Sequence, residues 1–131
     1  SSGVYAPVDC SNQIMTFDGS GNPTIRDESG VARTFASGRI TEERRPDGRS
    51  LVYAYDTSGR LTSVTHSSGR RLVLEYVSGF ASASNKVARI RNQTGTVLVS
   101  YTYGSTGNLL AVSKADGTQR SYKYENNAFP A

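Results

Sequence analysis

The sequence has one cysteine and one histidine among its 131 residues, and these shortages exclude several kinds of protein. A lone Cys10 excludes an internal disulfide framework, because each bridge needs two cysteines. No apolar run reaches 18 residues, so no membrane span is expected, and no charged and apolar leader predicts a signal peptide. The net charge of +4 is spread along the chain without a basic stripe, so no specific nucleic-acid binding is expected.

Serine, threonine and glycine, in contrast, make up about a third of the chain. These residues disfavour long helices, because glycine costs backbone entropy and the hydroxyl side chains compete for local hydrogen bonds. Leu, Ile, Val and Phe number 26, and eight tyrosines supplement them. The composition therefore predicts one domain of short strands joined by many turns, and not a large helical or doubly wound enzyme.

Glycines mark an internal repeat. Similar segments begin at Gly38, Gly59 and Gly107, and a fourth begins at Asn85 in the same frame. Each start is followed ten residues later by a second glycine, and a degenerate copy opens with Gly21 and Gly30. Successive second glycines, at positions 30, 48, 69, 95 and 117, are 18, 21, 26 and 22 residues apart, which is the spacing of a repeat protein.

Each repeat ends in an alternating apolar run, such as Leu51, Tyr53 and Tyr55, and in the later repeats polar residues such as Ser100 and Thr102 stand between the apolar ones. A period of two is typical of half-buried antiparallel strands. Asp47-Gly48 and Asp116-Gly117 are strong hairpin-turn signals, and Ser68-Gly69 is a weaker one. Each repeat is therefore predicted to form one β-hairpin.

The first strand of each repeat has an unusual spacing. Its apolar residues are three apart, as in Leu61 and Val64, Val87 and Ile90, or Leu109 and Val112. In a regular strand such residues would face opposite sides of the sheet. Either a β-bulge or a helical turn would bring them to one side, and the short, Ser- and Thr-rich segments favour the bulge.

The segment from Tyr55 to Thr65, followed by Gly69 and Tyr76, closely resembles the tyrosine-aspartate (YD) repeat of RHS proteins. Residues 38–56 and 107–125 match the same pattern, and residues 85–104 match it loosely. The resemblance covers about residues 16–131, and residues 1–15 form an N-terminal segment without a clear repeat. Residues 78–84 are expected to form a loop at the sheet rim, and residues 126–131 a connection to further sequence.

The resemblance implies an all-β fold, in which antiparallel repeated hairpins form a curved sheet that is part of a spiral shell. Bacterial RHS and toxin-complex proteins and the animal teneurins contain such repeats. In the bacterial proteins the shell encloses a C-terminal toxic domain. The implied function is therefore a structural fragment of the shell of a secreted bacterial polymorphic toxin, made in the cytoplasm and delivered to a target cell by a secretion system.

The expected partners are the other repeats of the parent shell and the enclosed effector domain. A homodimer through the sheet edges is a further expectation, because an isolated segment has two unpaired edges and an uncovered apolar face.

Seven tyrosines recur at equivalent places, and they form the candidate ligand or packing face. They are Tyr53, Tyr55, Tyr76, Tyr101, Tyr103, Tyr122 and Tyr124. As a packing face they are expected to stack in a column across neighbouring hairpins. The alternative is that the chain is a carbohydrate- or cell-surface-binding module, in which exposed rings bind glycans.

No catalytic, cofactor-binding or metal-binding residues are expected, and the chain is not expected to be an enzyme. His66 could act as a base for Cys10 or a serine, but no nucleophile motif accompanies it. Glu42 and Glu43 are neighbours on a strand, so pairing with nearby arginines explains them better than a catalytic carboxylate pair does. The acidic segment 18–22 lacks the terminal Glu of a calcium loop.

Overall fold

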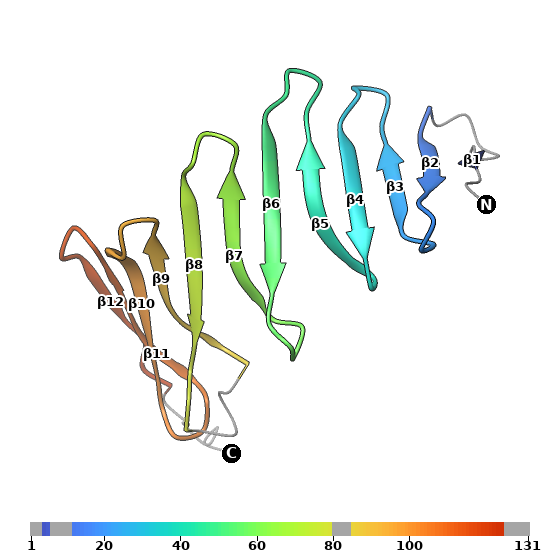
Figure 1. Ribbon diagram of the computed structural model, residues 1–131. Coiled ribbons are helices and arrows are strands. Elements are labelled where there is room, and N and C mark those ends of the chain that lie inside the picture. The colour runs from blue at the N-terminus through green and yellow to red at the C-terminus, as the bar shows by residue number, and fades with distance from the viewer. Residues whose placement is uncertain (1–3, 6–11, 80–84, 125–131) are drawn as a thin grey trace, which may run out of the picture. The chain divides into compact units, whose positions relative to one another are not determined.

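The computed structural model describes residues 4–5, 12–79 and 85–124, and every regular element in these ranges is a β-strand (Figure 1). The strands are β1 (Val4–Tyr5), β2 (Ile14–Phe17), β3 (Pro23–Arg26), β4 (Ala32–Ala36), β5 (Arg39–Arg44), β6 (Ser50–Tyr55), β7 (Leu61–His66), β8 (Arg71–Tyr76), β9 (Val87–Asn92), β10 (Val97–Tyr103), β11 (Leu109–Lys114) and β12 (Gln119–Ser121). Within these ranges there is no helix long and apolar enough to span a membrane.

The chain divides into two compact units, residues 1–71 and 72–131, with the boundary at the start of β8. In the first unit each strand from β1 to β6 pairs antiparallel with the next strand along the chain. In the second unit β8 to β12 pair in the same way. The predicted all-β fold of repeated antiparallel hairpins is confirmed.

One turn geometry recurs at nearly every hairpin. The first and fifth residues are linked by an N–H···O=C bond, and the glycine at the fourth position donates its N–H to the first carbonyl, as in the turn from Asp56 to Arg60. In this turn Gly59 has a φ of +79°. The described residues contain eight such turns, at 18–22, 27–31, 45–49, 56–60, 66–70, 92–96, 104–108 and 114–118.

The turn geometry refines the sequence prediction. An Asp-Gly pair in a two-residue primed turn would place both residues at positive φ. At Asp47-Gly48 only the glycine has a positive φ, of +87°, so this is a three-residue hairpin loop with glycine in the left-handed position. Ser37 and Gly38 do form the two-residue type, with φ values of 51° and 73°.

The predicted bulges are present in the first strand of each repeat. Tyr55 lies opposite Leu61 while Ala54 lies opposite Ser63, so Thr62 is the extra residue. The register shifts in the same way at three other first strands, where the extra residues are Thr41 in β5, Ala88 in β9 and Leu110 in β11. In β7, β9 and β11 the bulge brings two apolar residues that are three apart to the same face, whereas in β5 the residue three after Ile40 is Glu43. A further shift, between Val97 and Val99, was not anticipated.

Two of the bulges are closed by a threonine hydroxyl. Thr41 Oγ1 donates to the Thr34 carbonyl at 3.2 Å, and Thr62 Oγ1 donates to the Ala54 carbonyl at 3.1 Å. In both cases the acceptor belongs to the neighbouring strand beside the bulge. The hydroxyl thus satisfies a carbonyl where the ladder is interrupted.

The described residues bury very little. Ala111, at 9% exposure, is the single buried apolar side chain among them, and Ser63, at 3%, is the single buried polar one. Several large apolar residues are exposed, including Val52, Leu72 and Leu110. The hairpins therefore leave apolar surface that these residues do not cover themselves.

Some expectations fall on residues outside the described ranges. These are Cys10, most of the predicted 78–84 loop and the terminal segment 126–131. The predicted boundary between the N-terminal segment, residues 1–15, and the repeat region, residues 16–131, stays a prediction. Strand β2 (Ile14–Phe17) spans this boundary.

Replacing Gly48 with Ala should lower the free energy of unfolding by about 1 kcal/mol, because a Cβ is strained at this φ. Gly48→Asn should cost less, since asparagine tolerates the left-handed region. Gly59→Ala should cost about as much as Gly48→Ala, because φ is similar and an added Cβ at position 59 meets only the far end of the flexible Arg39 side chain, which can move. Urea unfolding of the three variants measures this, and a loss at Gly48→Asn as large as at Gly48→Ala would contradict it.

Candidate functional site

The seven candidate tyrosines lie on alternate strands. Tyr53 and Tyr55 are in β6, Tyr76 is in β8, Tyr101 and Tyr103 are in β10, and Tyr122 and Tyr124 follow β12. Those within strands are half-buried, whereas Tyr122 and Tyr124 are 38% and 58% exposed. Whether the row binds a ligand stays a prediction.

The tyrosines of one strand share a face and lie opposite aliphatic residues of the neighbouring strand. Tyr53 lies opposite Val64, and Tyr55 lies opposite Leu61. The intervening Val52 and Ala54 are exposed on the other face. The predicted alternation of this strand is therefore confirmed.

The second unit has the same arrangement. Tyr101 and Tyr103 lie opposite Val112 and Leu109 of β11. Because β11 lies between β10 and β12, the backbones of the two outer strands are about 10 Å apart. Whether the tyrosine rings stack in a column stays a prediction. An aliphatic side chain occupies the position between two tyrosine-bearing strands.

The last tyrosine of β6 and that of β10 make the same hydrogen bond. Tyr55 Oη donates to the Ile40 carbonyl at 2.8 Å, and Tyr103 Oη donates to the Val87 carbonyl at 2.9 Å. Each acceptor comes directly before the extra residue of a bulge. The tyrosine therefore ties its own strand to the preceding strand where the ladder is irregular.

A cation lies over each of these rings. The Arg39 guanidinium is 5.9 Å from the Tyr55 ring centroid, and Lys86 Nζ is 5.7 Å from that of Tyr103. At this distance a cation is attracted to the aromatic face. We call the arrangement the tyrosine clasp: Arg39, Ile40 and Tyr55 in the first unit, and Lys86, Val87 and Tyr103 in the second.

Sequence reasoning missed the clasp. Its signal was the recurrence of a basic residue before the first apolar residue of a repeat, as in Gly38-Arg39-Ile40 and Asn85-Lys86-Val87. The spacing between Arg39 and Tyr55 did not reveal that the two side chains meet.

Burial raises the pKa of Tyr53, and the Glu43 carboxylate acts in the same direction. Burial likewise raises the pKa of Tyr103, helped by Tyr101. Both phenols are therefore neutral at physiological pH. Both rings pack against neighbouring residues, and the Tyr103 hydroxyl also donates a hydrogen bond. Because they are neutral, the two phenols are poorly suited to act as bases.

The aspartate that follows Tyr55 caps its own turn. Asp56 Oδ1 accepts hydrogen bonds from the Ser58 and Arg60 amides, both at 2.9 Å, and Oδ2 pairs with Arg60 Nε at 2.8 Å. The Arg60 amide, then its side chain, hold the pKa of Asp56 below its usual value. Asp18, Asp27 and Asn92 cap their turns in the same way.

His66 occupies the capping position in its turn. Its Nδ1 accepts the Ser68 amide hydrogen bond at 3.1 Å and lies 2.8 Å from Ser68 Oγ. The imidazole thus replaces the carboxylate that Asp56 supplies in the other turn. His66 therefore has a structural role in its turn, and this role requires no nucleophilic side chain nearby.

Glu42 and Glu43, which were considered as a catalytic pair, and Glu75 of β8 are all engaged in ion pairs. Glu42 pairs with Arg44 at 2.6 Å, Glu43 with Arg33 at 3.0 Å, and Glu75 with Arg91 at 2.6 Å. The predicted explanation by arginine pairing is confirmed, although Glu43 uses Arg33 on the neighbouring strand. Among residues 12–79 and 85–124, no three His, Cys, Asp or Glu side chains are grouped to hold a metal ion.

Residues 36–71 match the family model named RHS Repeat. This segment covers β5, β6 and β7, with their bulges, the clasp of Tyr55 and the capped turn at Asp56. Residues 36–71 of the chain are therefore similar to an RHS repeat. The predicted resemblance to the RHS/YD repeat is confirmed. No curated protein is significantly similar to the chain.

Tyr55→Phe should lower the free energy of unfolding of this chain by about 1 kcal/mol, because the Ile40 carbonyl loses its donor while the ring remains. Tyr53→Phe is the matched control, since the described residues show no hydrogen bond from its hydroxyl. Denaturant unfolding of both variants measures the difference. A loss at Tyr53 as large as at Tyr55 would contradict the role of the clasp.

Stability should fall in acid. The carboxyls of five turn aspartates have pKa values below the usual 3.8: Asp18, Asp27, Asp47, Asp56 and Asp116. A lowered pKa in the folded state stabilises above the unfolded value, so the contribution is complete above about pH 5 and is lost as pH falls through 3.8 and below. Asp56→Asn keeps the acceptor oxygen without the charge, and should show a weaker acid dependence. An unfolding midpoint unchanged between pH 5 and pH 2.5 would contradict this account.

Proposed function

We propose that this chain is a wall segment of an RHS-type shell that encloses a C-terminal effector domain in a secreted bacterial polymorphic toxin. The observation that carries the proposal is the repeat itself: in each unit, hairpin follows hairpin in chain order, with bulge and turn in the same place. Such an array is extended by adding repeats, without any change of strand order.

The lack of a buried core supports the same proposal. With Ala111 as the one buried apolar side chain among the described residues, each sheet face needs cover from outside them. The remaining repeats of the parent shell would pair with the open edges, and an enclosed effector would lie behind the wall. The mechanism is physical: a hydrogen-bonded sheet separates the effector from the producing cell, and the chain carries no catalytic step.

The alternative is a carbohydrate- or cell-surface-binding module. The exposure of Tyr122 and Tyr124 favours it, because open rings can pack on sugars. The strand tyrosines favour it less, since they are half-buried and two of them hold the clasp.

The first test is the mass of the endogenous polypeptide, detected with an antibody against residues 38–125. The wall proposal predicts a mass many times the 14.1 kDa of this chain. A mass near 14 kDa would sink the proposal and leave the binding module.

A second test uses protease on that intact polypeptide. The part downstream of this segment should be digested more slowly within the parent than when it is produced alone. Tyr55→Phe in the parent should increase its digestion, and Tyr53→Phe should have little effect. Equal digestion of the downstream part in all forms would contradict encapsulation, and saturable glycan binding lost on Tyr122→Ala would favour the alternative.

A further inference from the structure

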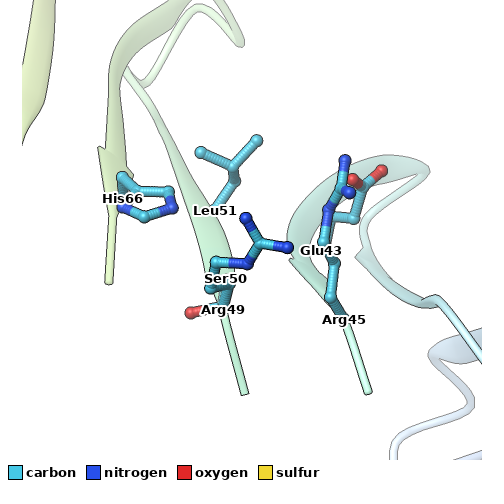
Figure 2. A pocket seen from close by; sticks show the side chains of 6 residues that line it. All are labelled: Glu43, Arg45, Arg49, Ser50, Leu51 and His66. Atoms are coloured by element: carbon cyan, nitrogen blue, oxygen red, sulfur yellow. The ribbon is translucent and has the colours of Figure 1, made fainter. Parts of the chain in front are cut away.

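A small pocket of about 200 Å³ lies at the end of β5 in the first unit (Figure 2). It takes no part in the tyrosine clasp. Its lining residues are Glu43, Arg45, Arg49, Ser50, Leu51 and His66.

The strand register assembles this pocket. Glu43 of β5 lies opposite Leu51 of β6, which lies opposite His66 of β7, so the three side chains form one row on one face. Arg45 and Arg49 are the first and fifth residues of the turn between β5 and β6, joined by a backbone hydrogen bond of 2.8 Å. One turn therefore places two guanidinium groups beside an aliphatic side chain.

Most acceptors around the pocket are already engaged, whereas several donors are not. Arg49 directs Nε and Nη2 at Asp47 Oδ2, at 2.7 and 2.6 Å, which leaves its Nη1 group. The Glu43 carboxylate is held by Arg33, from outside the pocket. Within the part of the chain that the structure describes, no ion pair within 4 Å engages Arg45. Because His66 Nδ1 accepts a hydrogen bond, a neutral ring carries its proton on Nε2.

We propose that this pocket binds the carboxylate of an acidic side chain of a partner polypeptide. A planar carboxylate matches the forked donors of a guanidinium, and the methylene groups of a glutamate would contact Leu51. Figure 2 shows Arg45 and Glu43 side by side on one wall, with Arg49 between them and Leu51. The negative charge of Glu43 makes the site better suited to a single charge than to a phosphate dianion.

A peptide side chain fits the donor set better than an acidic sugar does. A sugar ring would need acceptors for several hydroxyl hydrogens, and the one carboxylate in the lining is engaged by Arg33. The proposal holds whether or not the chain is part of a shell.

The test is an NMR titration of the ¹⁵N-labelled 131-residue chain with the peptide acetyl-Gly-Glu-Glu-Gly-amide. The glutamine version of the peptide is the control ligand. We expect amide shifts confined to residues 45–51 and 66–68, with the glutamate peptide alone. Arg45→Gln should weaken binding about tenfold or more, because it removes a charged donor.

Arg44→Gln is the matched control variant. Arg44 adjoins Arg45 in sequence, but it pairs with Glu42, which lies opposite Val52 on the other face. Binding to this variant should be unchanged. If Arg45→Gln gives a poorly dispersed spectrum, Arg45→Lys replaces it, and a smaller loss of affinity is expected.

Several results would overturn the proposal. One is the absence of localised shifts at millimolar peptide, and another is an equal response to the glutamine peptide. A third is equal weakening by Arg44→Gln and Arg45→Gln. Tighter binding of glucuronate or of inorganic phosphate at the same amides would assign the pocket to a sugar acid or a phosphate instead.

Discussion

The extra residue in the first strand of each hairpin is the constraint on which the other contacts depend. Without Thr62 as a bulge, Leu61 and Val64 would face opposite sides of the sheet, and the tyrosines of β6 would lose one of their two partners. A bulge also interrupts the ladder and leaves backbone groups to be satisfied. The threonine hydroxyls of two bulges and the tyrosine hydroxyls of the two clasps satisfy carbonyls at these interruptions.

These contacts are local to a hairpin and its neighbour, and this locality explains why the sequence repeats. The glycine turn and the bulge recur from hairpin to hairpin, whereas the described residues show the clasp beside two of the four bulges and an aspartate cap at only some of the turns. Because a single sheet buries few side chains, such hairpins gain stability mainly from adjacent copies. The proposed wall of a larger shell follows from that dependence, since more repeats provide more neighbours.

The repeat, the hairpins and the bulges could be predicted from sequence because they rest on spacings within one repeat. Leu61 and Val64 are three residues apart, and only a β-bulge or a helical turn would bring both side chains to one face. The short, Ser- and Thr-rich segment favoured the bulge. The clasp could not be predicted in the same way, because Arg39 and Tyr55 belong to different strands and their contact depends on how β5 pairs with β6. The pocket could not be predicted because it depends on the register of three strands, β5, β6 and β7. The turn role of His66 could not be predicted because an imidazole there accepts the hydrogen bond that an aspartate accepts in other turns.

Cross-strand nuclear Overhauser effects between β6 and β7 in the isotope-labelled chain test the central claim most directly. The account predicts contacts that place Tyr55 opposite Leu61 and Ala54 opposite Ser63, with Thr62 unpaired between them. Contacts that place Tyr55 opposite Thr62 would mean a regular strand without a bulge. That result would contradict the shared face, the clasp and the explanation of the repeat together.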